Sequence, residues 1–369
     1  MQKSIFTTAQ ITLLKEKIQQ WSTKLGFDGV GFSDTNLTRA EESLFKWLGW
    51  NRHGEMAYMY RHGTRRTRPT ELVSGTISVI SFRMNYFPKK AAPAIEALQN
   101  PNIGYISRYA LGRDYHKLIR QRLQQLANHI TTEIGPFNYR AFADSAPVME
   151  KPLAVKAGLG WIGKHTNLIS HDRGSWFFLG ELYTDLPLPV DQTPIDHCGS
   201  CSACISACPT GAIVAPYQLD ARLCISYLTI EHKSSIPLTL RPLIGNRIFG
   251  CDDCQLACPW NRDAPSSGLH DFEPRYNLDH TTLLDLFEWS EEDFERKTTG
   301  SPIHRIGYDR WLRNLAVALG NGPGGEQAER ALRRRLCHPS ALVREHVQWA
   351  LECHARVNQH SNSIHRRQV

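Results

Sequence analysis

The sequence lacks any long hydrophobic run: no stretch of its 369 residues approaches the roughly 18 apolar residues that a membrane-spanning helix needs. Its first residues, MQKSIFTTAQ, show neither the basic and then apolar regions of a secretory signal nor a twin-arginine or lipidation motif. These absences predict a cytoplasmic protein with no membrane partner. They also count against disulfides for its 10 cysteines, since a disulfide framework is typical of short secreted chains.

A strong nicotinamide-binding signal is missing too. No G-x-G-x-x-G follows a first predicted strand, and the nearest glycine-rich turn, GLGWIG, comes only at residues 158–163. The apolar content of 41% is ordinary for a folded chain, and the length predicts two or three domains. A tightly bound organic or corrin cofactor is the alternative that remains.

Lysine is absent from the last part of the chain, although the formal net charge is +7. Residues 301–369 contain eleven arginines and only five acidic residues, and the segment RHGTRRTRP at 61–69 is also rich in arginine. The guanidinium group binds phosphate oxygens in pairs, so these segments suit a nucleic-acid partner. A solvated protein face explains the same charges equally well.

Cysteine, in contrast, is concentrated. The run CGSCSACISACP at 198–209 has the C-x2-C-x2-C-x3-C-P spacing of bacterial ferredoxins, in which the fourth thiolate reaches a second cluster. GCDDCQLACP at 250–259 repeats the end of this pattern, and Cys224 can supply the remaining thiolate. The predicted ligands of the first [4Fe-4S] cluster are Cys198, Cys201, Cys204 and Cys258. The predicted ligands of the second are Cys208, Cys224, Cys251 and Cys254.

Structural zinc is the main alternative for these cysteines. A zinc site takes four ligands arranged as two separated pairs, which explains neither the consecutive run nor its repeat. The clusters are therefore the favoured interpretation. Cys337 and Cys353 stand outside both sets in helical patterns and are assigned no role.

The remaining patterns divide the chain into three parts. Residues 1–190 alternate helical patterns, at 8–25 and 113–135, with strand patterns near 27–34, 76–82, 138–144 and 176–183. This alternation predicts an α/β layer domain. Residues 191–263 hold the cysteines and predict a small domain stabilised by its metal. Residues 264–369 are helical throughout, and SALVREHVQWALE resembles a HEAT-type repeat, with too few units for a free-standing solenoid. We expect these helices to dock on the rest of the protein.

Several segments together resemble the epoxyqueuosine reductase family, which performs the last step of queuosine biosynthesis. The iron-sulfur segments are shared with many oxidoreductases, but their combination with SRYALGRDYHK and ADSAP is specific. The match covers nearly the whole chain and rests on HGEMAYM, SRYALGRDYHKLIR, ADSAPVMEK, AGLGWIGKH, GSWFFLGEL, CGSCSACISACPTGAI, DARLCISYLTIE and GNRIFGCDDCQLACPWN.

The resemblance implies an N-terminal cobalamin-binding domain, followed by a ferredoxin-like domain whose two [4Fe-4S] clusters pass electrons to cobalamin. The substrate implied is the epoxide of epoxyqueuosine at the wobble position of tRNA, which the reduced cobalt converts to an alkene with loss of water. The external donor would be a low-potential flavodoxin- or ferredoxin-like protein, and we expect a monomer. A cobalamin-dependent reductive dehalogenase acting on a small molecule is the alternative function.

The resemblance also assigns individual residues. Asp144 in ADSAP occupies the proton-donor position, and a carboxyl group can donate only when a desolvated site raises its pKa; capping a helix that begins near Val148 is the alternative role. DYHKLI at 114–119 begins like the cobalt-binding histidine motif D-x-H-x-x-G, but Ile119 replaces its glycine. Asp114 is therefore predicted to cap the helix that follows it. The implied cobalamin contacts are Arg66, Ser107, Asp144, Leu168, Leu179 and Ser226.

Overall fold

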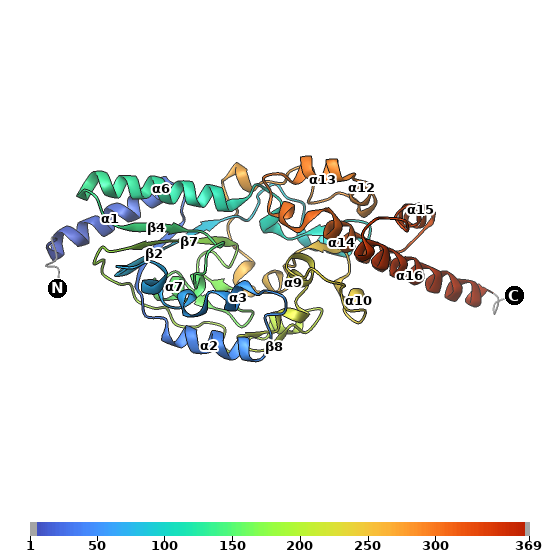
Figure 1. The fold of residues 1–369 in the computed structure, drawn as a ribbon, viewed down its shortest axis with the longest axis horizontal. Coiled ribbons are helices and arrows are strands. Elements are labelled where there is room, and N and C mark those ends of the chain that lie inside the picture. Colours follow the sequence, from blue (N-terminus) through green and yellow to red (C-terminus); the bar gives the residue numbers. More distant parts are fainter. Residues whose placement is uncertain (1–5, 366–369) are drawn as a thin grey trace.

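The computed structural model describes residues 6–365, with side chains described up to residue 356. Arg366 and Arg367, which belong to the C-terminal arginines counted above, lie outside the described residues. A sheet covered by helices forms one end of the molecule, the cysteine segment lies in the middle, and the C-terminal helices form the other end (Figure 1). Among the described helices, none combines the length and the apolar character needed to cross a membrane.

The N-terminal part is built on a four-stranded sheet. Its order is β1-β2-β7-β4, and each neighbouring pair is antiparallel. The strand patterns in the sequence are confirmed, but the alternation of strands and helices produces antiparallel pairs, so this part is α+β. The strands are β1 (Gly29–Asp34), β2 (Ser78–Asn85), β4 (Tyr139–Phe142) and β7 (Phe177–Thr184).

Helices cover both faces of this sheet (Figure 1). On one face, α1 (Thr8–Lys24) and α6 (Tyr115–Ile134) bury their apolar stripes against alternate residues of the strands, as the helical spacing predicts. Gly180 of β7 allows this approach, because a Cβ atom there would lie 2.7 Å from Ile119. The other face is covered by α7 (Glu150–Lys156).

A second pairing joins distant parts of the chain. The short strand β3 (Tyr105–Ile106) pairs in parallel with β10 (Arg247–Phe249), so the N-terminal part contributes a segment to the middle of the molecule. Ile106 of β3 and the residues Ala110 and Leu111 that follow it share one hydrophobic core with the cysteine segment and the C-terminal helices. The three parts of the chain are therefore packed together rather than joined by free linkers.

The cysteine segment consists of short elements that carry the thiols on their ends. Helices α8 and α11 lie within the two cysteine runs and pack against each other. Cys224 precedes α9 and therefore lies at the start of a helix. These elements are α8 (Ala203–Ser206), β8 (Ile213–Ala215), β9 (Gln218–Leu219), α9 (Ile225–Ile230) and α11 (Asp253–Leu256).

The C-terminal helices dock on this segment, as expected. The buried Arg313 guanidinium donates to the carbonyls of Leu228, His232 and Ser234. The neighbouring Asn314 amide donates to the carbonyls of two further residues in the cysteine segment. The C-terminal helices are α12 (Leu283–Phe287), α13 (Glu291–Thr298), α14 (Gly307–Asn321), α15 (Glu326–Arg334) and α16 (Ala341–His365).

Candidate active site between the sheet and the cysteine segment

A cavity of about 490 Å³ lies where the start of β7, the loop after β4 and the cysteine segment meet. This volume is in the range of pockets that bind an organic ligand, about 300–1,000 Å³. Five of the six residues expected to contact cobalamin line the cavity, and only Arg66 does not. The five are Ser107, Asp144, Leu168, Leu179 and Ser226.

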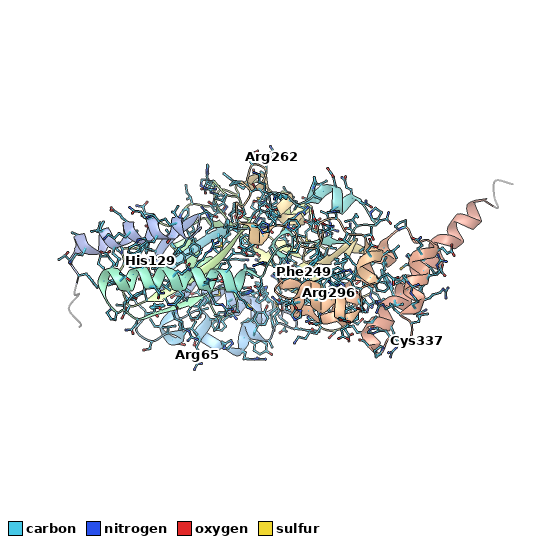
Figure 2. All side chains as sticks on the ribbon, turned by 90° about the horizontal axis from the view of Figure 1, so that it is seen from above. Arg65, His129, Phe249, Arg262, Arg296 and Cys337 are labelled. Atoms are coloured by element: carbon cyan, nitrogen blue, oxygen red, sulfur yellow. The ribbon has the colours of Figure 1, made fainter. Side chains whose placement is uncertain are left out.

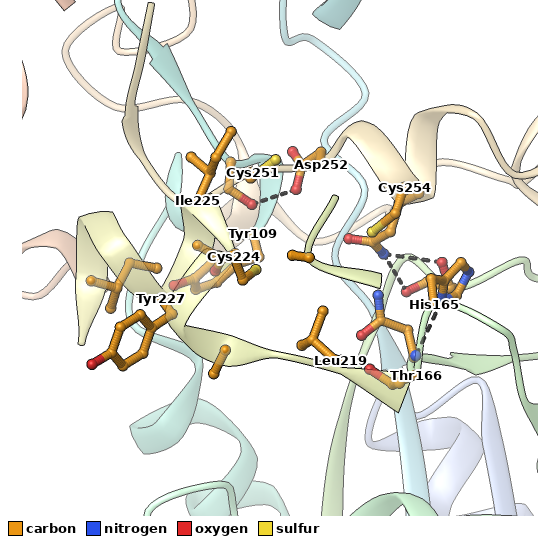
Figure 3. Close-up of a pocket in the computed structure, with 18 of the residues that line it drawn as sticks. Tyr109, His165, Thr166, Leu219, Cys224, Ile225, Tyr227, Cys251, Asp252 and Cys254 are labelled. Carbon is orange, nitrogen blue, oxygen red and sulfur yellow. Dashed lines mark hydrogen bonds between the residues drawn. The ribbon is translucent and has the colours of Figure 1, made fainter. Parts of the chain in front are cut away.

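One wall of the cavity is formed by one of the two predicted cysteine sets. We call Cys208, Cys224, Cys251 and Cys254 the inner set, because all four line the cavity. Three of them can be followed in the close-up of the cavity (Figure 3). Burial and the charges of Cys224 and Cys208 raise the pKa of the Cys254 thiol, which places these thiols near one another.

The other predicted set lies behind this wall. Cys198, Cys201, Cys204 and Cys258, the outer set, contribute nothing to the cavity lining. Burial and the charges of the other three members raise the pKa of the Cys258 thiol, so this remote cysteine does lie beside the first run.

The two sets differ in exposure and are neighbours. In the outer set Cys201 is exposed and Cys204 and Cys258 are buried, whereas all four inner cysteines are half-buried. Cys204 of the outer set also acts on Cys254 of the inner set, so the two sets are adjacent. Within residues 6–356, no three Cys, His, Asp or Glu side chains converge closely enough to hold a single metal ion. A four-iron cube does not require such convergence, since its ligands are distributed over different irons.

Asp144 faces the cavity from a strained loop two residues after β4. Its backbone φ of +53° is unusual for a residue other than glycine, although aspartate tolerates it better than most. The backbone N–H of Asp144 donates to Glu150 Oε1 over 2.7 Å, which ties the loop to the first turn of α7. Helix α7 begins at Glu150 and has no side-chain cap, so the helix-capping role for Asp144 is wrong.

Two side chains of α6 hold the Asp144 carboxylate. Tyr115 donates its hydroxyl proton to Asp144 Oδ2 over 2.6 Å, and His116 Nε2 lies 3.3 Å from the same oxygen. Burial alone would raise the pKa of Asp144, but these two contacts lower it below its ordinary value. The raised pKa expected for a desolvated proton donor is therefore not found in this structure.

Arg66 lies outside the cavity lining but near it. The buried Arg66 guanidinium donates to the carbonyl of Tyr58, which does line the cavity, and its Nε atom has no partner among the described residues. His165 lines the cavity, and its buried Nε2 atom likewise lacks a described partner. Buried polar atoms of this kind normally have a hydrogen-bond partner, so both fit a ligand with polar edges.

The structure adds residues that the sequence did not indicate. Asp252 lines the cavity and is buried, and it accepts hydrogen bonds from the Tyr105 hydroxyl, the Ser107 hydroxyl and the Arg108 N–H. Ser107 is thus held by a carboxylate from the second cysteine run. Asp114 caps α6 as predicted, but the two residues that follow it, which contact Asp144, were not identified as part of the site.

The two arginine-rich segments differ in their contacts. In the C-terminal helices, Arg333 and Arg334 form ion pairs with glutamates, and Arg335 donates to the carbonyls of Phe287 and Trp289. These contacts favour a structural role for the three arginines over contact with a nucleic acid. Cys337, one of the two cysteines assigned no role, lies among these helices at one end of the molecule (Figure 2).

The segment at 61–69 lies closer to the cavity. Arg61 and Arg65 are exposed and form no ion pair with any described residue, and Arg65 lies at the edge of the molecule (Figure 2). Arg61 ends the short helix α3 (Tyr58–Arg61), whose first residue lines the cavity. This segment is therefore the better candidate for contacts with an anionic ligand.

Comparison with known proteins agrees with this geometry. The family model described as "Epoxyqueuosine reductase QueG, DUF1730" matches residues 66–145, and the model described as "4Fe-4S double cluster binding domain" matches residues 197–261. The second match contains all eight cysteines of the inner and outer sets.

Solved structures share the fold. An epoxyqueuosine reductase crystallised with an epoxyqueuosine-modified tRNA-Tyr stem loop has a TM-score of 0.85 at 26% identity, over 93% of this chain and 90% of that one. A Bacillus subtilis epoxyqueuosine reductase, captured with the catalytic loop of an aspartate swung out of its active site, has a TM-score of 0.82 at 26% identity, over 93% and 91%.

Among curated relatives, epoxyqueuosine reductase of Pseudomonas aeruginosa is 59% identical over 92% of this chain and 94% of its own length. The epoxyqueuosine reductase of Escherichia coli K12 is 56% identical over 92% of this chain and 89% of its own. With such identities across nearly its whole length, the chain belongs to the epoxyqueuosine reductase family.

Proposed function

We propose that this protein reduces epoxyqueuosine at the wobble position of tRNA to queuosine. The reaction takes up two electrons and two protons, converts the epoxide to an alkene and releases the oxygen as water. One observation carries the proposal: a single cavity has the inner cysteine set on one wall and Asp144 on another. Electrons and protons can therefore be delivered to the same bound group.

The electron path follows from the arrangement of the two sets. The outer set would hold one [4Fe-4S] cluster and the inner set the other, with the crossed ligands Cys258 and Cys208 joining the two runs. Because the inner set lines the cavity and the outer set includes the exposed Cys201, electrons would enter at the outer cluster. The donor would be a low-potential flavodoxin- or ferredoxin-like protein, and the enzyme would act as a monomer.

The chemistry of the cavity lining suits cobalamin as the electron acceptor. Leu168 and Leu179 offer an apolar surface, Ser107 and Ser226 offer hydroxyl groups, and the unpartnered Nε of Arg66 lies nearby. When bound, cobalamin supplies a cobalt centre that accepts single electrons and reduces the epoxide. The chain's own part is to hold this group between the inner cysteines and Asp144.

Asp144 is the proposed proton donor. Opening an epoxide leaves charge on oxygen, so an acid must stand beside it. Asp144 lies on the cavity surface, and its side chain is 46% exposed and so accessible to a substrate. The aspartate loop named for the Bacillus subtilis relative supports a catalytic role for this strained loop.

The substrate would be bound through the rim of the cavity. Tyr58 and Tyr60 are exposed by 41% and 56%, and exposed aromatic rings can stack on unpaired bases of an RNA loop. Arg61 and Arg65 beside them can contact phosphate. The tRNA-bound relative supports tRNA as the substrate, which in turn implies a cytoplasmic enzyme.

We also propose the division of the chain suggested by its sequence. Residues 1–190 would form the cobalamin-binding domain, residues 191–263 the ferredoxin-like domain, and residues 264–369 the HEAT-like helical domain. The packing of α14 against α16 supports the HEAT-like description of the last part. The β3–β10 pair crosses the first boundary, so we expect these domains to unfold together.

A direct test is to purify the protein without oxygen, load both cofactors, and incubate the reduced enzyme with epoxyqueuosine-containing tRNA. Conversion to queuosine, measured by mass spectrometry of nucleosides, is the expected result. Absence of conversion, together with halide release from a small organohalide, would favour the reductive dehalogenase instead.

A further inference from the structure

The proposed reaction needs two protons, and Asp144 is the carboxyl group proposed to deliver them to the substrate. Asp144 carries a lowered pKa, so its carboxyl group is ionised at neutral pH and has no proton of its own to give. Tyr115 also lines the cavity, but burial and the Asp144 charge raise its pKa well above the ordinary value, so its proton is retained. Another group must supply protons to Asp144.

His116 is placed to do this. Its Nε2 atom lies 3.3 Å from Asp144 Oδ2, and its Nδ1 atom lies 2.6 Å from Asp114 Oδ1, so the ring bridges two carboxylates. The ring stacks on Tyr115 with centroids 4.2 Å apart, which fixes its orientation. His116 does not line the cavity and is 17% exposed, so it can exchange protons with water without touching the substrate.

We propose that His116, oriented by Asp114, is a positioning residue that passes protons to Asp144 across the Nε2–Oδ2 contact. This inference rests on the proposed function. For each proton, His116 Nε2 gives its hydrogen to Asp144 Oδ2, and Asp144 gives a hydrogen to the substrate oxygen. The first transfer accompanies cleavage of one C–O bond, and the second accompanies departure of the oxygen as water. His116 is left neutral and recovers its proton from solvent, while the two electrons come from the external donor.

The charges around His116 favour its protonated form. Burial alone would lower the pKa of His116, but the hydrogen bonds and charges of Asp114 and Asp144 raise it to about 9. Glu150, on the first turn of α7, also interacts electrostatically with this histidine, and burial and the Asp144 charge raise the pKa of Glu150. Arg120 is a nearby cation and donates to the His116 carbonyl. Arg305, Arg66 and Lys151 are the cations that interact with the Asp144 charge. A histidine that stays charged at neutral pH has both ring nitrogens as donors, as the relay requires.

The test compares His116→Gln and Asp114→Asn in the cofactor-loaded enzyme. Asparagine is a good helix cap, so Asp114→Asn should preserve α6 and remove only one charge beside His116. Pre-reduced enzyme and tRNA are mixed, and the single-turnover rate is measured from pH 6 to 10. The parent rate should fall as pH rises through about 9, where His116 loses its proton. In Asp114→Asn this fall should begin at a lower pH, because the charged form of His116 has lost one partner.

His116→Gln should lower the rate at neutral pH roughly tenfold or more and abolish the fall near pH 9, as expected for a lost general acid. Carbon-13 NMR of labelled histidine provides a readout independent of turnover: the signal missing from His116→Gln should titrate near pH 9 in the parent and lower in Asp114→Asn. An unchanged pH profile in both variants, or a histidine signal that titrates at its ordinary value in the parent, would overturn the relay. A shift of the pH profile in Glu150→Gln, and not in the His116 and Asp114 variants, would assign the relay to Glu150 and so overturn the role of His116. Failure of the parent to convert epoxyqueuosine would refute the proposed function but leave the NMR result readable.

Discussion

Two walls of the cavity are built in different ways: the sulfur wall, which carries the inner cysteine set, and the acid wall, which carries Asp144. The sulfur wall comes from a compact segment in which four thiols are carried by short elements within residues 208–254. The acid wall is assembled from the loop after β4 and the first turn of α6, which meet only because both pack on the same end of the sheet. Electron delivery is thus encoded locally, whereas proton delivery depends on the tertiary fold.

This difference has a consequence for substitutions. A lost thiol removes a ligand from a cluster that the segment needs for its own stability, so its effects spread through the cysteine segment. A change at Asp144 or His116 alters a proton path on an already folded scaffold. The two walls should therefore fail in different ways, and the predictions below are ordered from the largest expected effect to the smallest.

Cys254→Ala should have the largest effect. It removes an inner ligand beside the cavity, so the inner cluster should be lost and turnover driven by an electron-donor protein should be abolished. Iron and sulfide analysis with EPR of the reduced variant checks the cluster content. Cys337→Ala is the matched control, because Cys337 is exposed and outside both sets, and it should behave like the parent. Two intact clusters in Cys254→Ala would contradict the assignment of the sulfur wall.

Asp144→Asn should be the strongest variant of the acid wall. Asparagine keeps the size and tolerates the positive φ of this position, but it has no proton to transfer. The variant should fold and retain cobalamin and both clusters, while single-turnover reduction of the epoxide falls by a factor on the order of 10² to 10⁴. Near-parental rates with pre-reduced enzyme would remove Asp144 from the catalytic role.

The same contrast explains what could be predicted from the sequence. The cysteine spacing is a local pattern, and it predicted both sets; Cys258 does lie beside the first run, as the pattern requires. Helical and strand periodicity likewise located α1, α6 and the sheet strands. The periodicity could not give the antiparallel strand order or the β3–β10 pair, because strand pairing depends on contacts between residues far apart in the chain.

Only part of the acid wall could be predicted from the sequence. Asp144 was assigned through family resemblance, and composition alone would not have separated it from the other acids. Asp114 was correctly expected to cap α6, yet His116 two residues later was missed. Its function arises from a contact with Asp144, and no spacing rule connects the start of one helix to the end of a strand that follows it.

Cys258→Ala separates the two sets. Because Cys258 lies in the second run but beside the first, its loss should damage the cluster of Cys198, Cys201 and Cys204 and spare the inner one. Donor-driven turnover should fail, whereas a small chemical reductant that reaches the cavity should still support turnover. Spectroscopy that shows loss of the inner cluster alone would contradict the crossed arrangement and, with it, entry of electrons at the outer set.

The smallest expected effect concerns tRNA binding at the rim between the walls. Replacing Arg61 and Arg65 with glutamine should weaken binding and lower the salt dependence, because each lost phosphate contact removes about 0.7 from the slope of log K against log salt for single-stranded RNA. Two contacts therefore predict a decrease of about 1.4. The matched control is the double substitution Arg333→Gln and Arg334→Gln. Both arginines already pair with glutamates, so replacing them should leave the slope unchanged. The affinity for tRNA is measured by fluorescence anisotropy at several salt concentrations. A lower slope in the control variant alone would assign the RNA contacts to the C-terminal helices instead of the cavity rim.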